Sequence, residues 1–375
     1  VLSQRLALMD RHEFESLAKE HHEGQKLRKM TRWGQFVAML VGQLSGRRSL
    51  RDIIANLGAQ QHKLYHAGVG KVSRSSLARV NESQPYTLYE TLFARLLGRC
   101  RNPAPKHKFR FKNPLFSMDA STIELSLSIF PWAEFRKKKG AIKLHGGLDH
   151  DGLIPAFMSI TEGKCHDIQA ARNIDLPRGS ILAVDRGYND YEWFNSLNDK
   201  DIFFVTRLKK NAKYTVVERR SCIKTGGLTS DQEIRLTSKK GSLYKGRLRR
   251  IGFICPETGK HYFFLTNNMK LSARTIAAIY KERWQIELFF KWIKQNLKSK
   301  SFVGTSKNAV LTHIWIAMCA YLIMAYLKFS SRLTLAVSEM VRLLQLNLFD
   351  RRILHDLLSP PGRPDPDDDR QLVML

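Results

Sequence analysis

The period of the apolar residues changes near residue 109, and this change limits the fold more than any other feature. Before it, apolar residues recur at helical spacing, as in Phe36, Leu40 and Leu44. After it, residues 115–128 alternate in the manner of a strand, and residues 141–150 and 153–163 give two more strand patterns. A helical segment, a buried strand ending at Asp185, a short helix and a strand within residues 201–210 follow. The sequence therefore predicts an α/β sheet behind a helical region.

This order of three strands, a helix, a strand, a helix and a strand is that of a ribonuclease H-like sheet. Residues 207–265 interrupt it with short strand-like runs, and residues 207–250 carry 14 Lys or Arg against three acids. We expect an α/β fold in five parts. These are an all-helical domain (1–105), a ribonuclease H-like catalytic core in two parts (106–206 and 266–330), a β-rich basic insertion between them (207–265), and C-terminal helices with an acidic tail (331–375).

The net charge of +28, from 62 Lys and Arg against 34 Asp and Glu, predicts a polyanionic partner, and nucleic acid fits best because the basic residues are spread along the chain. Within residues 1–105, Ser49 and Ser73 each precede a helical segment. The two segments fit a helix-turn-helix reader of DNA and a generic helical bundle equally well. Five widely spaced cysteines without zinc-ligand spacing favour a reduced, cytoplasmic setting.

Residues 308–327 lack charges over a length that is sufficient to span a membrane. The polar residues Asn308, Thr312 and His313 within this segment favour a buried core helix instead. The chain is also very basic throughout, and no second apolar segment of this length accompanies the first.

Residues 280–294 combine a broad apolar surface with one polar stripe. On a helix that turns about 100° per residue, the stripe contains one phenol, one carboxylate and three cations: Tyr280, Arg283, Glu287, Lys291 and Lys294. A carboxylate among cations suits a metal ion beside a phosphate. An amphipathic helix with a solvated basic face is the alternative interpretation of this stretch taken alone.

Asp119, in the first strand, and Asp185, at the end of the fourth, belong to strands that are neighbours in a ribonuclease H-like sheet. Because reactive groups gather at strand ends in such sheets, we expect the two carboxylates to meet, with Glu287 completing the cluster. Three carboxylates in one place need cations to neutralise them, which two Mg²⁺ ions would do. Competing carboxylates are Glu124, Asp149, Asp167 and Asp190, of which we expect Asp167 to cap a helix.

The spacing Tyr280, two residues, Arg283, three residues, Glu287, six residues, Lys294 resembles the Tyr-Arg-Glu-Lys signature of a group of bacterial insertion-sequence transposases of the DDE class. Asp119 in SMDAS and Asp185 in AVDRGY are similar to the two aspartates of that family. The resemblance implies a cut-and-paste DNA transposase in which Asp119, Asp185 and Glu287 are catalytic and bind metal, with two Mg²⁺ ions that Mn²⁺ can replace. It also implies that Tyr280, Arg283 and Lys294 grip DNA phosphate.

The same resemblance implies terminal inverted repeats and target DNA as partners, a DNA-end-binding N-terminal domain, a homodimer in the DNA complex and a cytoplasmic, nucleoid-associated location. Further DNA-phosphate contacts are expected from Lys291 and from basic residues of the insertion: Lys239, Lys240, Arg247, Arg249 and Arg250. Some relatives use an inserted Trp to handle a flipped base; here Tyr262, Phe263 or Phe264 would have to replace it. Two other functions fit the residues: a ribonuclease H-fold nuclease without strand transfer, and a non-enzymatic DNA-binding regulator derived from a transposase.

Overall fold

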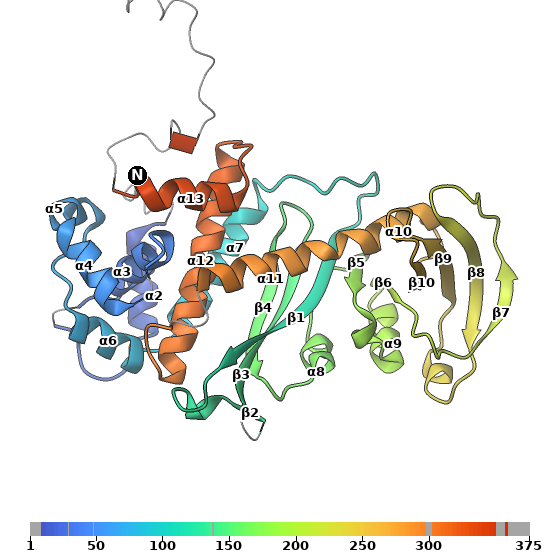
Figure 1. Cartoon of the computed structure of the whole chain (residues 1–375), viewed down its shortest axis with the longest axis horizontal. Coiled ribbons are helices and arrows are strands. Elements are labelled where there is room, and N and C mark those ends of the chain that lie inside the picture. The colour runs from blue at the N-terminus through green and yellow to red at the C-terminus, as the bar shows by residue number, and fades with distance from the viewer. Residues whose placement is uncertain are drawn as a thin grey trace, which may run out of the picture. The chain divides into compact units, whose positions relative to one another are not determined.

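A computed structural model of the chain describes residues 9–28, 30–47, 49–136, 139–297, 302–349 and 357–358. The chain divides into two compact units (Figure 1). One comprises residues 1–103 and 308–375, and the other comprises residues 104–307. The acidic tail predicted at the C-terminus lies outside the described residues.

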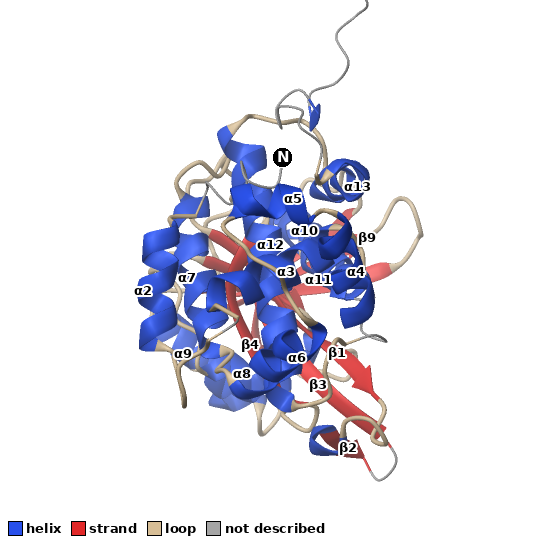
Figure 2. Cartoon of the chain, turned by 90° about the vertical axis from the view of Figure 1, so that its left-hand side faces the viewer, coloured by secondary structure: helices blue, strands red, loops and turns tan. Residues whose placement is uncertain are grey.

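The first unit contains only helices among its described residues (Figure 2). Side-chain oxygens of Asp10, Thr31, Ser49 and Ser73 accept hydrogen bonds from first-turn amides, which fixes where four of the helices begin. The helices are α2 (Arg11–Glu20), α3 (Arg32–Leu44), α4 (Leu50–Ala59), α5 (Gln61–Leu64), α6 (Arg74–Ser83), α7 (Thr87–Arg101), α12 (Lys307–Ser330) and α13 (Val337–Asn347).

Helix α12 belongs with the N-terminal helices, whereas the sequence analysis assigned residues 266–330 to the core. The Asn308 side chain donates hydrogen bonds to the carbonyl oxygens of Asn81 and Gln84. The ring of Trp315 packs on that of Phe93, with centroids 5.3 Å apart. Among the described residues, α12 is the one helix long and apolar enough to cross a membrane, and 94% of its most apolar window is buried inside the structure. This burial confirms the prediction of a core helix.

The second unit is built on one ten-stranded sheet in the order β2-β3-β1-β5-β6-β10-β9-β8-β7, with β4 paired to β3. Strand β1 is parallel to β5 and antiparallel to β3, and β5 is parallel to β6. The strands are β1 (Leu115–Leu125), β2 (Glu134–Arg136), β3 (Lys139–Asp149), β4 (Ile154–Glu162), β5 (Ile181–Val184), β6 (Phe203–Arg207), β7 (Tyr214–Arg219), β8 (Leu228–Leu236), β9 (Leu248–Ile254) and β10 (His261–Thr266).

The five core strands and the strand-like runs of residues 207–265 that the sequence predicts are strands in the structure, and β2 is added to them. The four strands of the predicted insertion continue the core sheet instead of standing apart from it. The junction is made by β10, which pairs antiparallel with β6, with Leu265 opposite Thr206. The unit is therefore a mixed α/β structure with a single large sheet.

Alternate residues of the central strands point to opposite faces of the sheet, and each face has its own helices. Phe116 and Leu182 pack with α8 (Asp167–Arg172) and α9 (Tyr191–Asp199). Leu115 and Ile181 pack with α10 (Ala273–Glu282). Helix α11 (Trp284–Leu297) continues from α10 and contacts β1 and β3 (Figure 1). Asp119 has the same parity as Leu115, so it faces α10 and α11.

Candidate active site

Asp119 and Asp185 follow the last register pair that joins β1 to β5. In this parallel pairing Met118 lies opposite Val184, and each aspartate is the next residue along the chain. Strand β1 continues beyond Asp119 because β3 supports it, with Asp119 opposite Gly146. The predicted meeting of the two strands therefore occurs, with the carboxylates at adjacent positions.

Helix α11, which carries Glu287, approaches the sheet above Gly146. A Cβ atom at Gly146 would lie 3.2 Å from the Phe290 ring, tighter than normal packing allows without displacement. The absence of a side chain at Gly146 therefore lets this helix lie close to β1 opposite Asp119. Phe290 and Glu287 are one turn apart on α11, so this approach also brings the Glu287 carboxylate toward the sheet.

Residues 280–294 do not form one continuous helix as predicted. Helix α10 ends at Glu282, Arg283 is its C-cap residue, and α11 begins at Trp284. The Arg283 amide donates to the Tyr280 carbonyl oxygen, and the Ile286 amide donates to the Arg283 carbonyl oxygen, so both bonds span only three residues. This tighter turn interrupts the stripe at Arg283 but keeps Arg283 and Glu287 on one side.

Arg283 joins two of the carboxylates. It is 8% exposed, and its Nη1 donates to Asp119 Oδ2 at 3.2 Å, while its Nη2 donates to Glu287 Oε1 at 2.5 Å. The third carboxylate, Asp185, accepts from Arg207 Nη2 at 2.9 Å and from the Tyr280 hydroxyl at 3.3 Å. Both guanidinium groups lie 5.6 Å from the centroid of the Tyr280 ring.

Burial and neighbouring charges shift the two aspartates in opposite directions. Burial raises the pKa of Asp119; the amide of Ala120 and Arg283 oppose this rise, while the charges of Glu287 and Asp185 add to it. Burial also acts to raise the pKa of Asp185, but the hydrogen bond and charge of Arg207, together with the Arg186 amide and the charge of Arg283, outweigh it and lower that pKa. The charges of Glu287 and Asp185 both act on Asp119, so the three carboxylates lie within electrostatic range of one another.

Arg207 is the residue of this site that the sequence analysis missed. It ends β6, the strand parallel and adjacent to β5, and contacts the carboxylate that follows β5. The sequence contained a signal for Arg207: it lies at the carboxyl end of a predicted strand, and the carboxyl ends of neighbouring parallel strands meet at one edge of the sheet. In the sequence, Arg207 is also the first residue of the predicted insertion.

The donor set fits a hard divalent cation, because all three groups are carboxylates and such ions prefer oxygen ligands. Arg283 now supplies the positive charge between Asp119 and Glu287. Among the described residues, no three His, Cys, Asp or Glu side chains are grouped closely enough to hold one ion. A metal would therefore bind by competing with the guanidinium groups for these oxygens.

A cleft of about 660 Å³ adjoins the cluster, lined in part by Asp185, Arg207 and Glu287. The aromatic residues Tyr262 and Trp284 also line this cleft, and Trp284 is 56% exposed. Two cations of the predicted stripe lie further along α11: Lys291 is exposed and Lys294 is half-buried. Neither lysine forms an ion pair with a described residue.

Two of the phosphate contacts predicted in the insertion are contradicted. Arg249 and Asp231 form an ion pair with side chains only 2% and 4% exposed, and Arg249 Nη1 also donates to the Leu271 carbonyl oxygen. Arg250 is buried beneath Phe263, with its guanidinium carbon 3.8 Å from the ring centroid. Both predictions are wrong. Arg249 and Arg250 are consecutive residues of β9, so their side chains point to opposite faces of the sheet, and each face is packed at this position.

The other basic residues predicted in the insertion lie at the surface. Arg247 is exposed but forms a two-point contact with Glu233, one of whose bonds measures 2.6 Å. Lys239 and Lys240 are exposed in the turn after β8.

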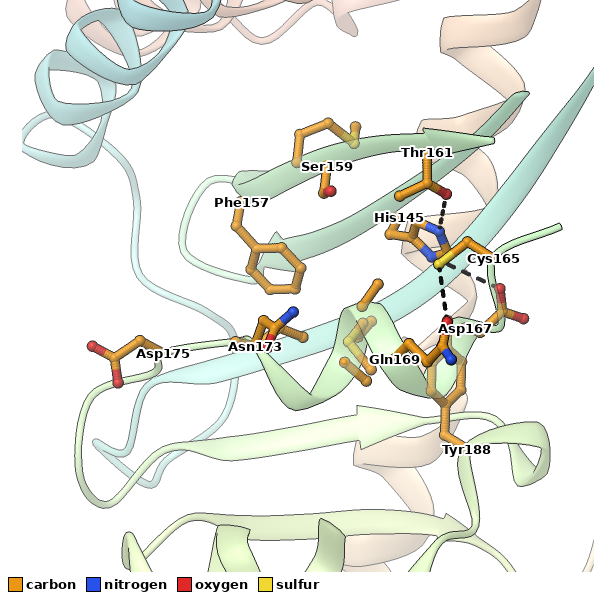
Figure 3. A pocket seen from close by; sticks show the side chains of 15 residues that line it. His145, Phe157, Ser159, Thr161, Cys165, Asp167, Gln169, Asn173, Asp175 and Tyr188 are labelled. Carbon is orange, nitrogen blue, oxygen red and sulfur yellow. Dashed lines mark hydrogen bonds and ion pairs between the residues drawn. The ribbon is translucent and has the colours of Figure 1, made fainter. Parts of the chain in front are cut away.

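A second cavity, of about 340 Å³, lies on the α8 face of the sheet (Figure 3). His145 is joined there to Thr161 by a hydrogen bond of 2.8 Å and lies 3.7 Å from Asp167. Asp167 also pairs with Lys143 at 3.0 Å. The N-cap of α8 is His166, so the prediction that Asp167 caps this helix is wrong. Asp119 points to the opposite face, and this cavity is separate from the carboxylate cluster.

The comparison with protein families now identifies the class. Residues 110–323 match the family described as the Transposase DDE domain, and residues 1–70 match a domain of unknown function. The first match covers more than half of the chain, so the chain belongs to the DDE transposase family. It is a DNA transposase, and its family implies dependence on divalent metal ions.

Individual relatives agree with this class. The chain is 33% identical to the candidate transposase y4zB of Sinorhizobium fredii, over 76% of this chain and 80% of that protein. It is 26% identical to a candidate transposase for insertion sequence element IS5377 of Geobacillus stearothermophilus, over 72% of this chain and 71% of that protein. A solved piggyBac transposase synaptic complex with hairpin DNA is 12% identical, covering 98% of this chain and 84% of that chain, with a TM-score of 0.45.

Proposed function

We propose that this transposase cuts DNA at the ends of an insertion sequence and joins the freed ends to target DNA at one site, formed by Asp119, Asp185 and Glu287. The observation that carries the proposal is the convergence of these three carboxylates on Arg283 and Arg207 at the edge where β1 and β5 meet. We also propose a ribonuclease H-like core, because the order β4-β3-β1-β5-β6 with β3 antiparallel matches that fold.

The three carboxylates are the proposed ligands of two Mg²⁺ ions, which Mn²⁺ can replace. Ions bound there would activate water and neutralise the charge that develops on the phosphoryl group. Asp185 is suited to this role because its lowered pKa keeps it ionised. Asp119 takes up a proton more readily than Asp185, since burial and two like charges raise the pKa of Asp119.

The cations of the site are proposed to hold the DNA strand. Arg283 offers a planar fork that fits phosphate once the carboxylates bind metal, and Arg207 offers a second. Tyr280, Lys291 and Lys294 would extend this contact along α10 and α11. The aromatic faces of Tyr262 and Trp284 in the adjoining cleft are suited to stacking on an unpaired base.

Further contacts with DNA are proposed outside the active site, together with a contact between two copies of the protein. Lys239 and Lys240 are exposed in the sheet extension and would contact phosphate there. The helical unit, residues 1–103 with 308–375, would bind the terminal inverted repeats. A homodimer would bring two element ends together in the cytoplasm, at the nucleoid.

Strand transfer is the step that separates a transposase from a nuclease of the same fold. Purified protein, a labelled duplex with a precut element end and a supercoiled plasmid should give joined products in Mg²⁺ or Mn²⁺ and none in a chelator. The same duplex with its 3′-hydroxyl blocked is the control and should remain unjoined. Cleavage without joining would support the nuclease instead, and specific binding without either reaction would support the regulator.

Replacing Arg283 by Ala is expected to destabilise the metal-free protein by about 1–3 kcal/mol, because Asp119 and Glu287 lose their shared counter-charge. The figure lies below that for a fully buried pair, since the two carboxylates are 24% and 32% exposed. Mn²⁺ should then raise the melting temperature of the variant more than that of the wild type. Thermal unfolding in chelator and in Mn²⁺ measures both effects, and equal shifts would argue against metal binding by these carboxylates.

A further inference from the structure

The helical unit contains a cleft that the catalytic site does not use. It has a volume of about 480 Å³ and lies where the end of α2 and the segment that follows it meet the start of α3. Its charged or titratable lining residues are Glu15, Lys19, His22, Lys26 and Arg32. The one acid, Glu15, is occupied by Arg11, whose Nε lies 2.8 Å from its Oε1. The cleft therefore has a surplus of positive charge.

Arg32 is the unusual residue of this cleft. It is only 5% exposed, and no carboxylate among the described residues pairs with it. Its Nη2 donates to the Pro85 carbonyl oxygen at 2.6 Å, and its guanidinium carbon lies 5.3 Å from the centroid of the Tyr89 ring. Its Nε and Nη1 have no hydrogen-bond partner among the described residues. Buried charges in proteins are normally paired, so Arg32 lacks an anion.

The N-terminus of α3 adds to the positive electrostatic potential of this cleft. This helix has 13 residues, with Thr31 as its N-cap and Arg32 as its first residue, and both line the cleft. The dipole of a helix places partial positive charge at its N-terminus and favours anions there. Arg32 and the dipole are independent reasons for the cleft to attract an anion, and Lys19 and Lys26 at its rim are exposed.

We propose that this cleft binds one phosphate of the DNA backbone, with Lys19, His22 and Lys26 contacting the phosphate and Arg32 supplying the buried charge beneath it. The proposal rests on the function proposed above, in which DNA is the substrate. It gives residues 1–70, which match a domain of unknown function, a part in DNA binding. A phosphate contact positions DNA without reading its sequence, so the cleft would serve duplexes of any sequence.

Salt-dependent DNA binding tests the proposal. Arg32→Met and Lys26→Ala are compared with wild type by fluorescence anisotropy on a labelled duplex, from about 50 to about 200 mM salt. Lys26→Ala removes one phosphate contact and should lower the slope of log affinity against log salt by about one. Arg32→Met should lower the slope as well, because the bound phosphate loses the charge beneath it. Arg51→Ala, which removes an exposed cation of α4 away from the cleft, is the matched control and should keep the wild-type slope.

Two further measurements complete the test. Arg32→Met should unfold at or above the wild-type temperature, because it removes an unpaired buried charge, whereas a purely structural Arg32 would give a lower temperature and an unchanged slope. Inorganic phosphate that stabilises the wild type while both slopes stay unchanged would assign the cleft to free phosphate and overturn the proposal. A wild-type protein that bound no DNA would overturn the proposed function as well, whereas unchanged slopes in the variants alone overturn only this inference.

Discussion

Asp185→Asn is expected to abolish DNA cleavage, with a loss of about a thousandfold or more, while DNA binding stays within about twofold of wild type. The substitution keeps the shape of the side chain but removes the charge that would bind metal. Asp119→Asn and Glu287→Gln should behave in the same way, because the three carboxylates act as one site. A double variant should be little worse than either single one. Cleavage of a labelled duplex in Mn²⁺, together with its binding in chelator, gives both quantities.

Glu124→Gln is the matched control for this series. Glu124 lies on the same strand as Asp119, is exposed, and undergoes the same change from carboxylate to amide. Its variant should cleave like the wild type. Loss of binding in parallel with loss of cleavage in the Asp185 variant would assign that residue to folding, since Arg207 would then have lost its partner. Wild-type cleavage by the Asp119 or Asp185 variants would remove the proposed active site.

The core strands were predictable because burial imposes a pattern on them. Residues of β1 alternate between two packed faces, and β5 reads as a continuous apolar run because both of its faces are covered. The ribonuclease H-like order of the elements then placed Asp119 and Asp185 on neighbouring strands. Their adjacency follows from strand order alone, so no knowledge of side-chain contacts was needed.

Features that depend on contacts between distant segments were not predictable. The pairing of β10 with β6 joins the insertion to the core sheet, and nothing local to either strand specifies that partner. The break at Arg283 is also a tertiary effect, because the sequence around it has a continuous helical pattern. The contacts of Arg283 with Asp119 and Glu287 likewise join residues that are distant or on different helical segments, and only the structure reveals them.

The basic residues of the insertion show why charge alone does not identify the cations that lie at the surface. The sequence suggests that Arg249 is a surface cation. In β9, however, its side chain points to a packed face of the sheet and forms an ion pair with Asp231 of β8. Lys239 and Lys240 lie in a turn, where alternation does not operate, and both are exposed. The net charge predicts a nucleic-acid partner, but it does not identify which cations contact that partner.

Arg249→Ala is expected to lower the free energy of unfolding by about 3–5 kcal/mol, because it leaves Asp231 as an unpaired charge that is 4% exposed. It should also free the Leu271 carbonyl oxygen, to which Arg249 Nη1 donates at 2.6 Å. The double variant Arg249→Met with Asp231→Leu should recover most of the lost stability, since two apolar side chains of similar size can replace a buried pair. Urea unfolding of the three proteins measures these differences.

DNA binding should separate Arg249 from the surface lysines. Folded Arg249→Met/Asp231→Leu protein should keep the wild-type salt dependence, because Arg249 has no surface to offer phosphate. Lys239→Ala/Lys240→Ala removes two exposed cations and should lower the salt slope by up to about two without loss of stability. A reduced slope in the apolar double variant would mean that β8 and β9 open on DNA and expose Arg249. An unchanged slope in both variants would place this end of the sheet outside the DNA interface, leaving the contacts to α10, α11 and the helical unit.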